Sequence, residues 1–256
     1  MIFPGFRVLL LTLFALLLAA GRSFAVTEYR VEVVSRIPHD KKAFTQGLLI
    51  HDGKIYESTG LYGESTLRRV NLTSGTLELV RKVPQEFFAE GLALVGDRLI
   101  QLTWREGKAL VYDVATLERT GEYDYAGEGW GLCFDGRVLY MSDGSASLNV
   151  RDPATFGELA RIPVTLNGRP VPYLNELEFI GNRIYANVWQ TDVIVMIDPA
   201  TGVVDGVVNA TGLLSPAERK GADVLNGIAH DPVTGRTYIT GKLWPTIFEV
   251  RFVPSK

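Results

Sequence analysis

The stretch "EGLALVGDRLIQLTW", residues 90–104, aligns without a gap on "NELEFIGNRIYANVW", residues 175–189. Each stretch consists of an apolar run, a tight turn containing glycine, and a second run rich in aromatic and branched residues, which is typical of a β-hairpin. Three further segments follow the same outline: 46–60, 130–144 and 226–242. The turn of 130–144 comes one residue earlier, and 226–242 is two residues longer. The sequence therefore contains five copies of one hairpin.

The spacing of the hairpins predicts the fold. They begin at residues 46, 90, 130, 175 and 226, so that successive copies are 40 to 51 residues apart. A third alternating run, a turn and a fourth run follow each of the first four hairpins. Four antiparallel strands in 40 to 50 residues is the unit of a β-propeller blade. A β-sandwich or a pair of small barrels is the alternative fold.

The two ends of the repeat array complement each other. The last unit finishes at residues 246–252 with only three strands, and the early run at residues 29–37 belongs to no unit. Pairing the two would remove two free sheet edges. We therefore expect an all-β, five-bladed β-propeller whose N-terminal strand closes the last blade.

The first 25 residues have the pattern of a secretory signal peptide. Arg7 precedes the apolar run at residues 8–20, and Ser23 and Ala25 fit a small-x-small cleavage site. An uncleaved anchor is the alternative, but this run is short against the roughly 20 residues of a spanning helix. We expect cleavage after Ala25, a periplasmic or secreted protein without a membrane anchor, and a single β-propeller domain at residues 26–256.

Composition limits the chemistry of the mature chain. Loss of Arg7 and Arg22 changes the net charge from −3 to −5, which disfavours binding to nucleic acid. Cys133 is the only cysteine, so an internal disulfide is impossible. Zinc ligands are poorly supplied, because the three histidines are scattered; they are His39, His51 and His230. We expect neither a metal nor another cofactor.

The unusual residues fall at one end of the hairpins. The first residue of the first strand and the last residue of the second should lie side by side. The predicted pairs are Gln46 with Gly60, Glu90 with Trp104, Trp130 with Gly144, Asn175 with Trp189, and Asn226 with Lys242. Since the first strand of a blade lines the central channel, these positions should form a ring around one mouth. Aromatic walls with a few polar groups are typical of a small-molecule site.

Glu90 is the residue that most needs an explanation. It lies within the apolar stretch "FFAEGLAL", residues 87–94, where a buried carboxylate is costly unless it is paired or used chemically. We interpret it as facing a pocket, with Phe44 and Phe88 on the same side. Structural alternatives are that Glu90 pairs with Lys242, that the tryptophans and phenylalanines pack the core, and that the amide side chains cap turns or the backbone.

Seven motifs resemble the plant and bacterial type of glutaminyl cyclase (glutaminyl-peptide cyclotransferase). They are "FTQGL", "FAEGLAL", "LTW", "GEGWGLCFDG", "YLNELEF", "ANVWQTD" and "LNGIAHD…TGKLWP", and they cover all five units. The resemblance implies a metal-independent propeller enzyme that converts an N-terminal glutaminyl residue of a peptide or protein to pyroglutamyl and releases ammonia. We expect peptides and proteins with an N-terminal glutamine to be its partners and the enzyme to be a monomer.

The resemblance also implies the site residues. The acid–base glutamate of the family corresponds to Glu90. Its pocket residues correspond to Phe44, Gln46, Phe88, Trp104, Trp130, Asn175, Trp189 and Lys242, all of which are present. Asn226 is added to the substrate-binding set from the repeat alignment alone.

Residue chemistry assigns roles to this set. Glu90 can take a proton from the α-amine and pass it to the departing nitrogen. Aromatic surroundings should raise its pKa, whereas Lys242 should lower it. Lys242, Gln46 and Trp130 can donate to the amide oxygen as it becomes negative, and Asn175 can bind the substrate backbone or amide. We therefore predict Glu90 and Lys242 to be catalytic.

Two other functions are compatible with an aromatic channel mouth. One is a non-catalytic secreted propeller that binds a peptide or sugar. The other is a calcium-dependent propeller hydrolase of lactones or esters, which is less compatible because calcium needs several convergent oxygen ligands. The predicted ring offers one carboxylate.

Overall fold

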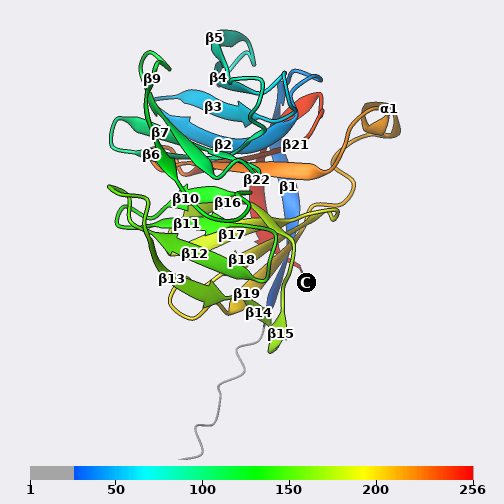
Figure 1. The fold of residues 1–256 in the computed structure, drawn as a ribbon. Coiled ribbons are helices and arrows are strands. Elements are labelled where there is room, and N and C mark those ends of the chain that lie inside the picture. The colour runs from blue at the N-terminus through cyan, green and yellow to red at the C-terminus, as the bar shows by residue number, and fades with distance from the viewer. Residues whose placement is uncertain (1–25, 256) are drawn as a thin grey trace, which may run out of the picture.

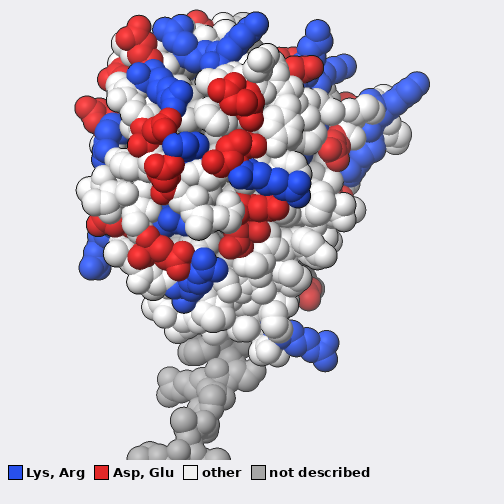
Figure 2. Space-filling model, viewed as in Figure 1, with Lys and Arg blue, Asp and Glu red and all other residues white. Residues whose placement is uncertain are grey.

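The computed structural model describes residues 26–255, which are almost entirely β-structure (Figure 1). The predicted signal peptide at residues 1–25 lies outside this range. In the described part of the chain, no helix is both long and apolar enough to cross a membrane. The face shown in Figure 2 carries interspersed acidic and basic side chains.

Three four-stranded sheets account for the first half of the chain, and the strands of each follow one another in sequence order. The first contains β2 (Thr45–His51), β3 (Lys54–Thr59), β4 (Thr66–Asn71) and β5 (Leu77–Lys82). The second contains β6 (Ala89–Val95), β7 (Arg98–Thr103), β8 (Lys108–Asp113) and β9 (Arg119–Asp124). The third contains β10 (Leu132–Phe134), β11 (Leu139–Ser142), β12 (Ser147–Arg151) and β13 (Glu158–Pro163).

The second half forms one eight-stranded sheet with two four-stranded halves. One half contains β16 (Leu174–Ile180), β17 (Arg183–Val188), β18 (Val193–Ile197) and β19 (Val204–Asn209). The other contains β20 (Leu225–Asp231), β21 (Arg236–Gly241), β22 (Thr246–Pro254) and β1 (Thr27–Pro38). A small hairpin precedes β16, and a single-turn helix precedes β20; these are β14 (Thr165–Leu166) with β15 (Arg169–Pro170), and α1 (Pro216–Arg219).

The N-terminal strand closes the last group, as predicted. β1 pairs antiparallel with β22, from Tyr29 opposite Pro254 to Pro38 opposite Thr246. Its first four residues also pair in parallel with β19. This second pairing, which the sequence did not predict, is what merges the last two groups into one sheet.

The first strands of the groups form a closed ring. β2 contacts β6 and β20, β10 contacts β6 and β16, and β16 contacts β20. Glycine permits the closest approaches: a Cβ atom on Gly91 would lie 2.6 Å from the backbone nitrogen of Leu132, and one on Gly131 would lie 2.0 Å from the carbonyl oxygen of Asn175. Apolar clusters fill the wedges between neighbouring sheets. The fold is thus the all-β propeller type that the repeats predicted.

Candidate active site

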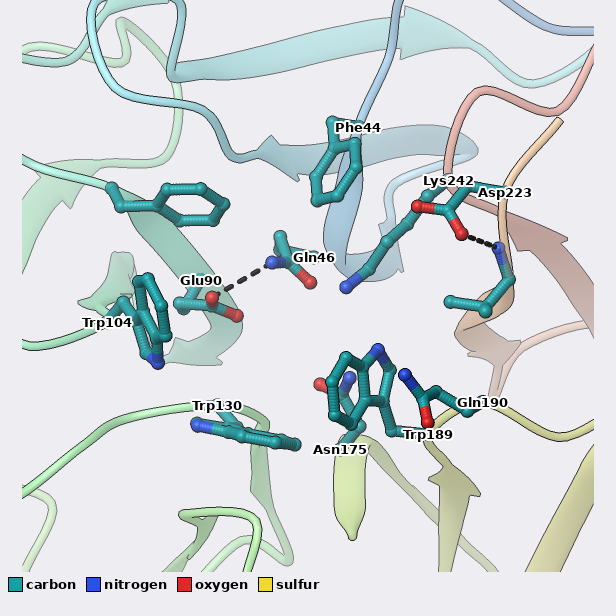
Figure 3. Close-up of a pocket in the computed structure, with 12 residues that line it drawn as sticks. Phe44, Gln46, Glu90, Trp104, Trp130, Asn175, Trp189, Gln190, Asp223 and Lys242 are labelled. Carbon is teal, nitrogen blue, oxygen red and sulfur yellow. Dashed lines mark hydrogen bonds between the residues drawn. The ribbon is translucent and has the colours of Figure 1, made fainter. Parts of the chain in front are cut away.

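A cavity of about 430 Å³ opens at one end of the ring (Figure 3). Its volume lies in the range of small-molecule sites. Nine of the ten predicted site residues line it: Phe44, Gln46, Phe88, Glu90, Trp104, Trp130, Asn175, Trp189 and Lys242. Three further lining residues were not predicted: Gln190, Asp223 and Val224.

β-Bulges place the polar residues of the cavity. The pairing register of the first hairpin breaks between Thr45 and Gly47, and the same irregularity recurs in three other hairpins. The first residues skipped at these breaks are Gln46, Glu90, Asn175 and Asn226; the last three breaks also skip the next residue, which is Gly91, Glu176 or Gly227. A bulge adds a residue to one strand and redirects its side chain. The same local device therefore sets four predicted site residues.

The bulges also make the predicted side-by-side pairs wrong. The backbone amide of Trp104 donates to the carbonyl of Phe88 rather than lying opposite Glu90 (2.9 Å). In the same way Gly60 bonds to Phe44, Trp189 to Tyr173 and Lys242 to Val224, while Trp130 bonds to Ser142. The extra residue in each bulged strand displaces its partner. All ten positions still lie at the same end of their hairpins, so the predicted arrangement around one mouth of the channel does not depend on the exact pairs.

Glu90 is a buried acid at the floor of the cavity. The residue is 5% exposed, and its Oε1 accepts a hydrogen bond from Gln46 Nε2 (2.9 Å). Burial raises the pKa of Glu90 well above its ordinary value, the positive charge of Lys242 opposes this, and the charges of Glu128 and Glu106 add to it. Within residues 26–255 no ion pair of 4.0 Å or less joins Glu90 to Lys242. The alternative of a structural Glu90–Lys242 pair is therefore wrong.

Lys242 presents a buried cation to the cavity. Its Nζ lies 4.8 Å from the centre of the Phe44 ring, a favourable cation–π geometry. Burial lowers the pKa of Lys242, whereas the negative charges of Glu90 and Asp223 raise it. Among the described residues Nζ has no hydrogen-bond acceptor, so its N–H groups remain available to a bound molecule.

Asn226 occupies a different place from the one predicted. It is fully buried behind Gln46 and does not line the cavity. Its Nδ2 donates to the carbonyl of Thr45 (2.9 Å) and to Gln46 Oε1 (3.2 Å). This second bond fixes the amide of Gln46 with its nitrogen toward Glu90. Asn226 therefore positions Gln46 from behind the cavity lining, because its side chain is directed into the neighbouring group of strands.

Glu128 is a site residue that the sequence reasoning missed. Its Oε2 accepts from the indole nitrogens of Trp104 (2.8 Å) and Trp130 (3.0 Å), and its Oε1 accepts from Arg105 Nε (3.0 Å). The Arg105 guanidinium also lies 3.7 Å over the Trp104 ring. Burial would raise the pKa of Glu128, but these three hydrogen bonds lower it overall. The single N–H of the Trp130 indole is therefore engaged by Glu128, and its predicted bond to an amide oxygen stays a prediction.

The remaining aromatic residues form the cavity wall. Phe88 makes edge contacts with Phe44 (6.2 Å between ring centres) and Trp104 (5.6 Å), and Trp130 makes one with Trp189 (5.5 Å). Core packing, the alternative for tryptophan, applies instead to Trp244, which is 1% exposed. Asn175 lines the cavity with a buried Oδ1 that has no hydrogen-bond partner. It can therefore accept from a bound N–H group.

The described residues contain no cluster of three or more His, Cys, Asp or Glu side chains that could hold a metal ion. The chemical groups gathered in the cavity are one buried acid, one buried cation, two buried amides and an aromatic wall, with an exposed amide and an exposed carboxylate at Gln190 and Asp223. Together the fold and the cavity define a β-propeller with a compact site suited to proton transfer on a small polar group.

Comparisons with known proteins agree with this description. The family described as "Glutamine cyclotransferase" matches residues 8–252. A glutaminyl-peptide cyclotransferase of Arabidopsis thaliana is 43% identical over 227 residues, which cover 86% of this chain and 71% of that protein. The crystal structure of Myxococcus xanthus glutaminyl cyclase superposes with a TM-score of 0.82 at 40% identity, covering 90% of this chain and 100% of that chain.

A likeness in fold alone extends further. The WD40 domain of Neurospora crassa Pan2 superposes with a TM-score of 0.50 at 11% identity, over 83% of this chain and 76% of that chain. This match supports the propeller architecture. On the family match and the two close relatives, the chain belongs to the glutamine cyclotransferase family.

Proposed function

We propose that this protein is a glutaminyl-peptide cyclotransferase, an acyl-transferring enzyme that converts the N-terminal glutaminyl residue of peptides and proteins to pyroglutamyl. The observation that carries the proposal is Glu90, a buried acid at the floor of an aromatic cavity. Gln46 donates a hydrogen bond to its carboxylate, and no basic side chain among the described residues forms an ion pair with it. The name of the Arabidopsis thaliana relative supports the same activity.

The reaction balances without any other reactant. The α-nitrogen of the substrate forms a bond to its own side-chain amide carbon, and the bond from that carbon to the amide nitrogen breaks. Glu90 accepts the proton lost by the α-amine and returns one to the departing nitrogen, which leaves as ammonia. A raised pKa suits both steps, because it makes the Glu90 carboxylate a better base toward the amine and keeps the carboxylic acid available to protonate the departing nitrogen.

The other cavity residues orient the substrate and stabilise charge. The reacting atoms are already tethered, so the aromatic wall contributes by holding the folded rotamer in which they are about 3 to 3.5 Å apart. Lys242, which has free N–H groups, is the donor we assign to the amide oxygen as it becomes negative. Asn175 Oδ1 accepts from the substrate amine or amide.

The wider setting is part of the proposal. We infer that cleavage after Ala25 releases a periplasmic or secreted enzyme without a membrane anchor, with residues 26–256 as its single catalytic domain. The net charge of the mature chain and the mixed charges on the face in Figure 2 support the expectation that nucleic acid is not a partner. We propose that the enzyme acts as a monomer and needs no metal or other cofactor.

The decisive experiment uses the purified mature chain with a peptide that begins with glutamine. Ammonia release and a peptide mass lower by one ammonia are expected, with full activity in the presence of a chelator. A Glu90→Gln variant with an unchanged melting temperature should lose turnover. Intact peptide that is bound but not converted would instead favour the non-catalytic binding protein, and loss of activity with chelator would favour a metal-dependent reaction.

A further inference from the structure

A second cavity adjoins the active-site cavity. It has a volume of about 280 Å³ and shares three lining residues with the first: Gln190, Asp223 and Val224. Its other lining residues are Thr191, Asp192, Arg219 and Ala222. We call these seven residues the rim groove. Because the two cavities have a common wall, a chain that leaves the first can enter the second.

Exposure within the active-site cavity indicates the direction of exit. Its floor residues, Glu90 among them, are buried, and its aromatic residues are half-buried. Gln190 and Asp223 are its exposed lining residues, and both belong to the rim groove. In Figure 3 they lie on the Lys242 side of the cavity, across from Trp104 and Glu90. The open side of the site is therefore the side of the rim groove.

The rim groove is held in place by the elements on which it lies. Gln190, Thr191 and Asp192 lie in the turn between β17 and β18, while residues 219–224 run from the last residue of α1 to the start of β20. Asp223 donates its backbone N–H to the carbonyl of Lys242 (2.9 Å), and its own carbonyl accepts from the indole of Trp244 (2.8 Å). An ion pair of 3.4 Å between Arg219 and Asp192 links the two sides. The groove is consequently preformed.

The charge of the rim groove is negative. Arg219 offsets Asp192 through their ion pair, but within the described residues Asp223 has no ion-pair partner. Its Oδ1 accepts only the backbone N–H of Val224 (2.8 Å), so the carboxylate keeps acceptor capacity for an incoming donor. A cationic side chain matches this arrangement, whereas an anionic one is repelled by Asp223.

We propose that the rim groove is the subsite for the residues that follow the N-terminal glutamine and that Asp223 makes it prefer a basic side chain there. This inference rests on the proposed function, since it takes the glutamine to occupy the first cavity. Exposed charge pairs contribute about 0.2–1 kcal/mol, so the preference for lysine over an uncharged residue should be about 1.4- to five-fold at low salt. The preference should weaken as salt screens the pair.

The test uses two peptide series, Gln-Xaa-Ala-Ala-amide and Gln-Ala-Xaa-Ala-amide, in which Xaa is Lys, Ala or Glu. Values of kcat/KM for the wild-type enzyme should fall in the order Lys, Ala, Glu in at least one series, mainly through KM. Asp223→Asn should bring the Lys-to-Glu ratio close to one. Asp97→Asn is the matched control, because Asp97 is an exposed carboxylate in the β6–β7 turn, at the opposite end of that hairpin from the cavity.

Equal kcat/KM values for Lys and Glu peptides in both series would overturn the proposal. So would an Asp223→Asn variant that slows every peptide by the same factor, because Asp223 would then act on the glutamine itself. If the wild-type enzyme converts no peptide, the proposed function fails separately. Dissociation constants of the same peptides, measured by tryptophan fluorescence with Glu90→Gln, then decide whether the groove discriminates by charge.

Discussion

Replacing Glu128 with glutamine tests whether one carboxylate sets the geometry of the aromatic wall. Glu128 accepts hydrogen bonds from Trp104, Trp130 and Arg105, which are all donors. A glutamine amide keeps one acceptor oxygen but offers N–H groups where the other carboxylate oxygen was. At least one of the three bonds is then lost, and a donor faces another donor.

The size of the effect follows from the exposure of Glu128. Hydrogen bonds to charged groups contribute about 1.5–3 kcal/mol each. The Glu128 side chain is 37% exposed, and solvent screening reduces that contribution to about 1 kcal/mol per bond. Loss of one or two bonds should therefore raise KM about 5- to 30-fold. Because Glu128 does not contact the reacting groups, kcat should change less than KM.

The same substitution should move the pH profile in a known direction. The negative charge of Glu128 raises the pKa of Glu90, so removing that charge lowers it. The protonation of Glu90 on acidification then occurs at lower pH, and the acid limb of kcat should move to lower pH. Ammonia release from Gln-Ala-Ala-amide across pH gives KM and kcat, and tryptophan emission reports the environment of the indoles.

Glu106 provides the matched control. It also raises the pKa of Glu90, but its carboxylate accepts from the Tyr62 hydroxyl (2.8 Å) and contacts neither indole nitrogen. Glu106→Gln should therefore move the acid limb in the same direction without the increase in KM. A Glu128→Gln enzyme with KM within about twofold of wild type, or with an acid limb moved to higher pH, would refute this account of the wall.

Three other substitutions make separate predictions. Lys242→Met should lower kcat about 10²- to 10³-fold, the cost of removing an oxyanion donor, and turnover close to wild type would remove Lys242 from the catalytic set. Gly91→Ala should cost about 1–3 kcal/mol in urea unfolding, because its Cβ would lie 2.6 Å from the Leu132 nitrogen; Gly121→Ala, which meets nothing within 4 Å, should be nearly neutral. His39 donates to the Trp244 carbonyl (2.8 Å) and to Glu57 Oε1 (2.9 Å), so the folded state holds it protonated. Burial lowers the pKa of His39, but the neighbouring Glu57 carboxylate raises it overall. The protonated His39 therefore stabilises the folded state fully below a pH of about 6.5, and this stabilisation is lost as the pH rises through the higher pKa of the folded state. His39→Gln should flatten the fall in melting temperature over that range, and an equally steep fall would show that other groups cause it.

Much of the fold was predictable because the repeats carry it. The apolar runs, turns and spacing of five hairpins appear directly in the sequence, and the unpaired strands at the two ends identify the contact between β1 and β22. The parallel pairing of β1 with β19 was not predictable, since it depends on how far a strand extends past its antiparallel partner.

The candidate site was predictable to the extent that it follows the repeat. Nine residues at or near equivalent hairpin ends line the cavity. Asn226 occupies an equivalent position, but its bulge aims it at Gln46, and no sequence pattern specifies the side to which a bulge turns. Glu128 and Asp223 lie in connections of unequal length, outside any repeat. The one sequence feature that pointed to Glu128 is its place two residues before Trp130 in "GEGWG".

The pairing of β1 with β22 also constrains the order in which the molecule can assemble. Ser35 on β1 donates to Glu249 on β22, across 214 positions of the chain. The earliest strand to be synthesised must therefore wait for the last, while the intervening groups can form from local hairpins. Contacts between such distant segments slow folding, because a long loop has to close before they are gained. Ring closure is accordingly the step we expect to limit the rate of refolding, and a chain shortened before β22 would leave β1 without its antiparallel partner.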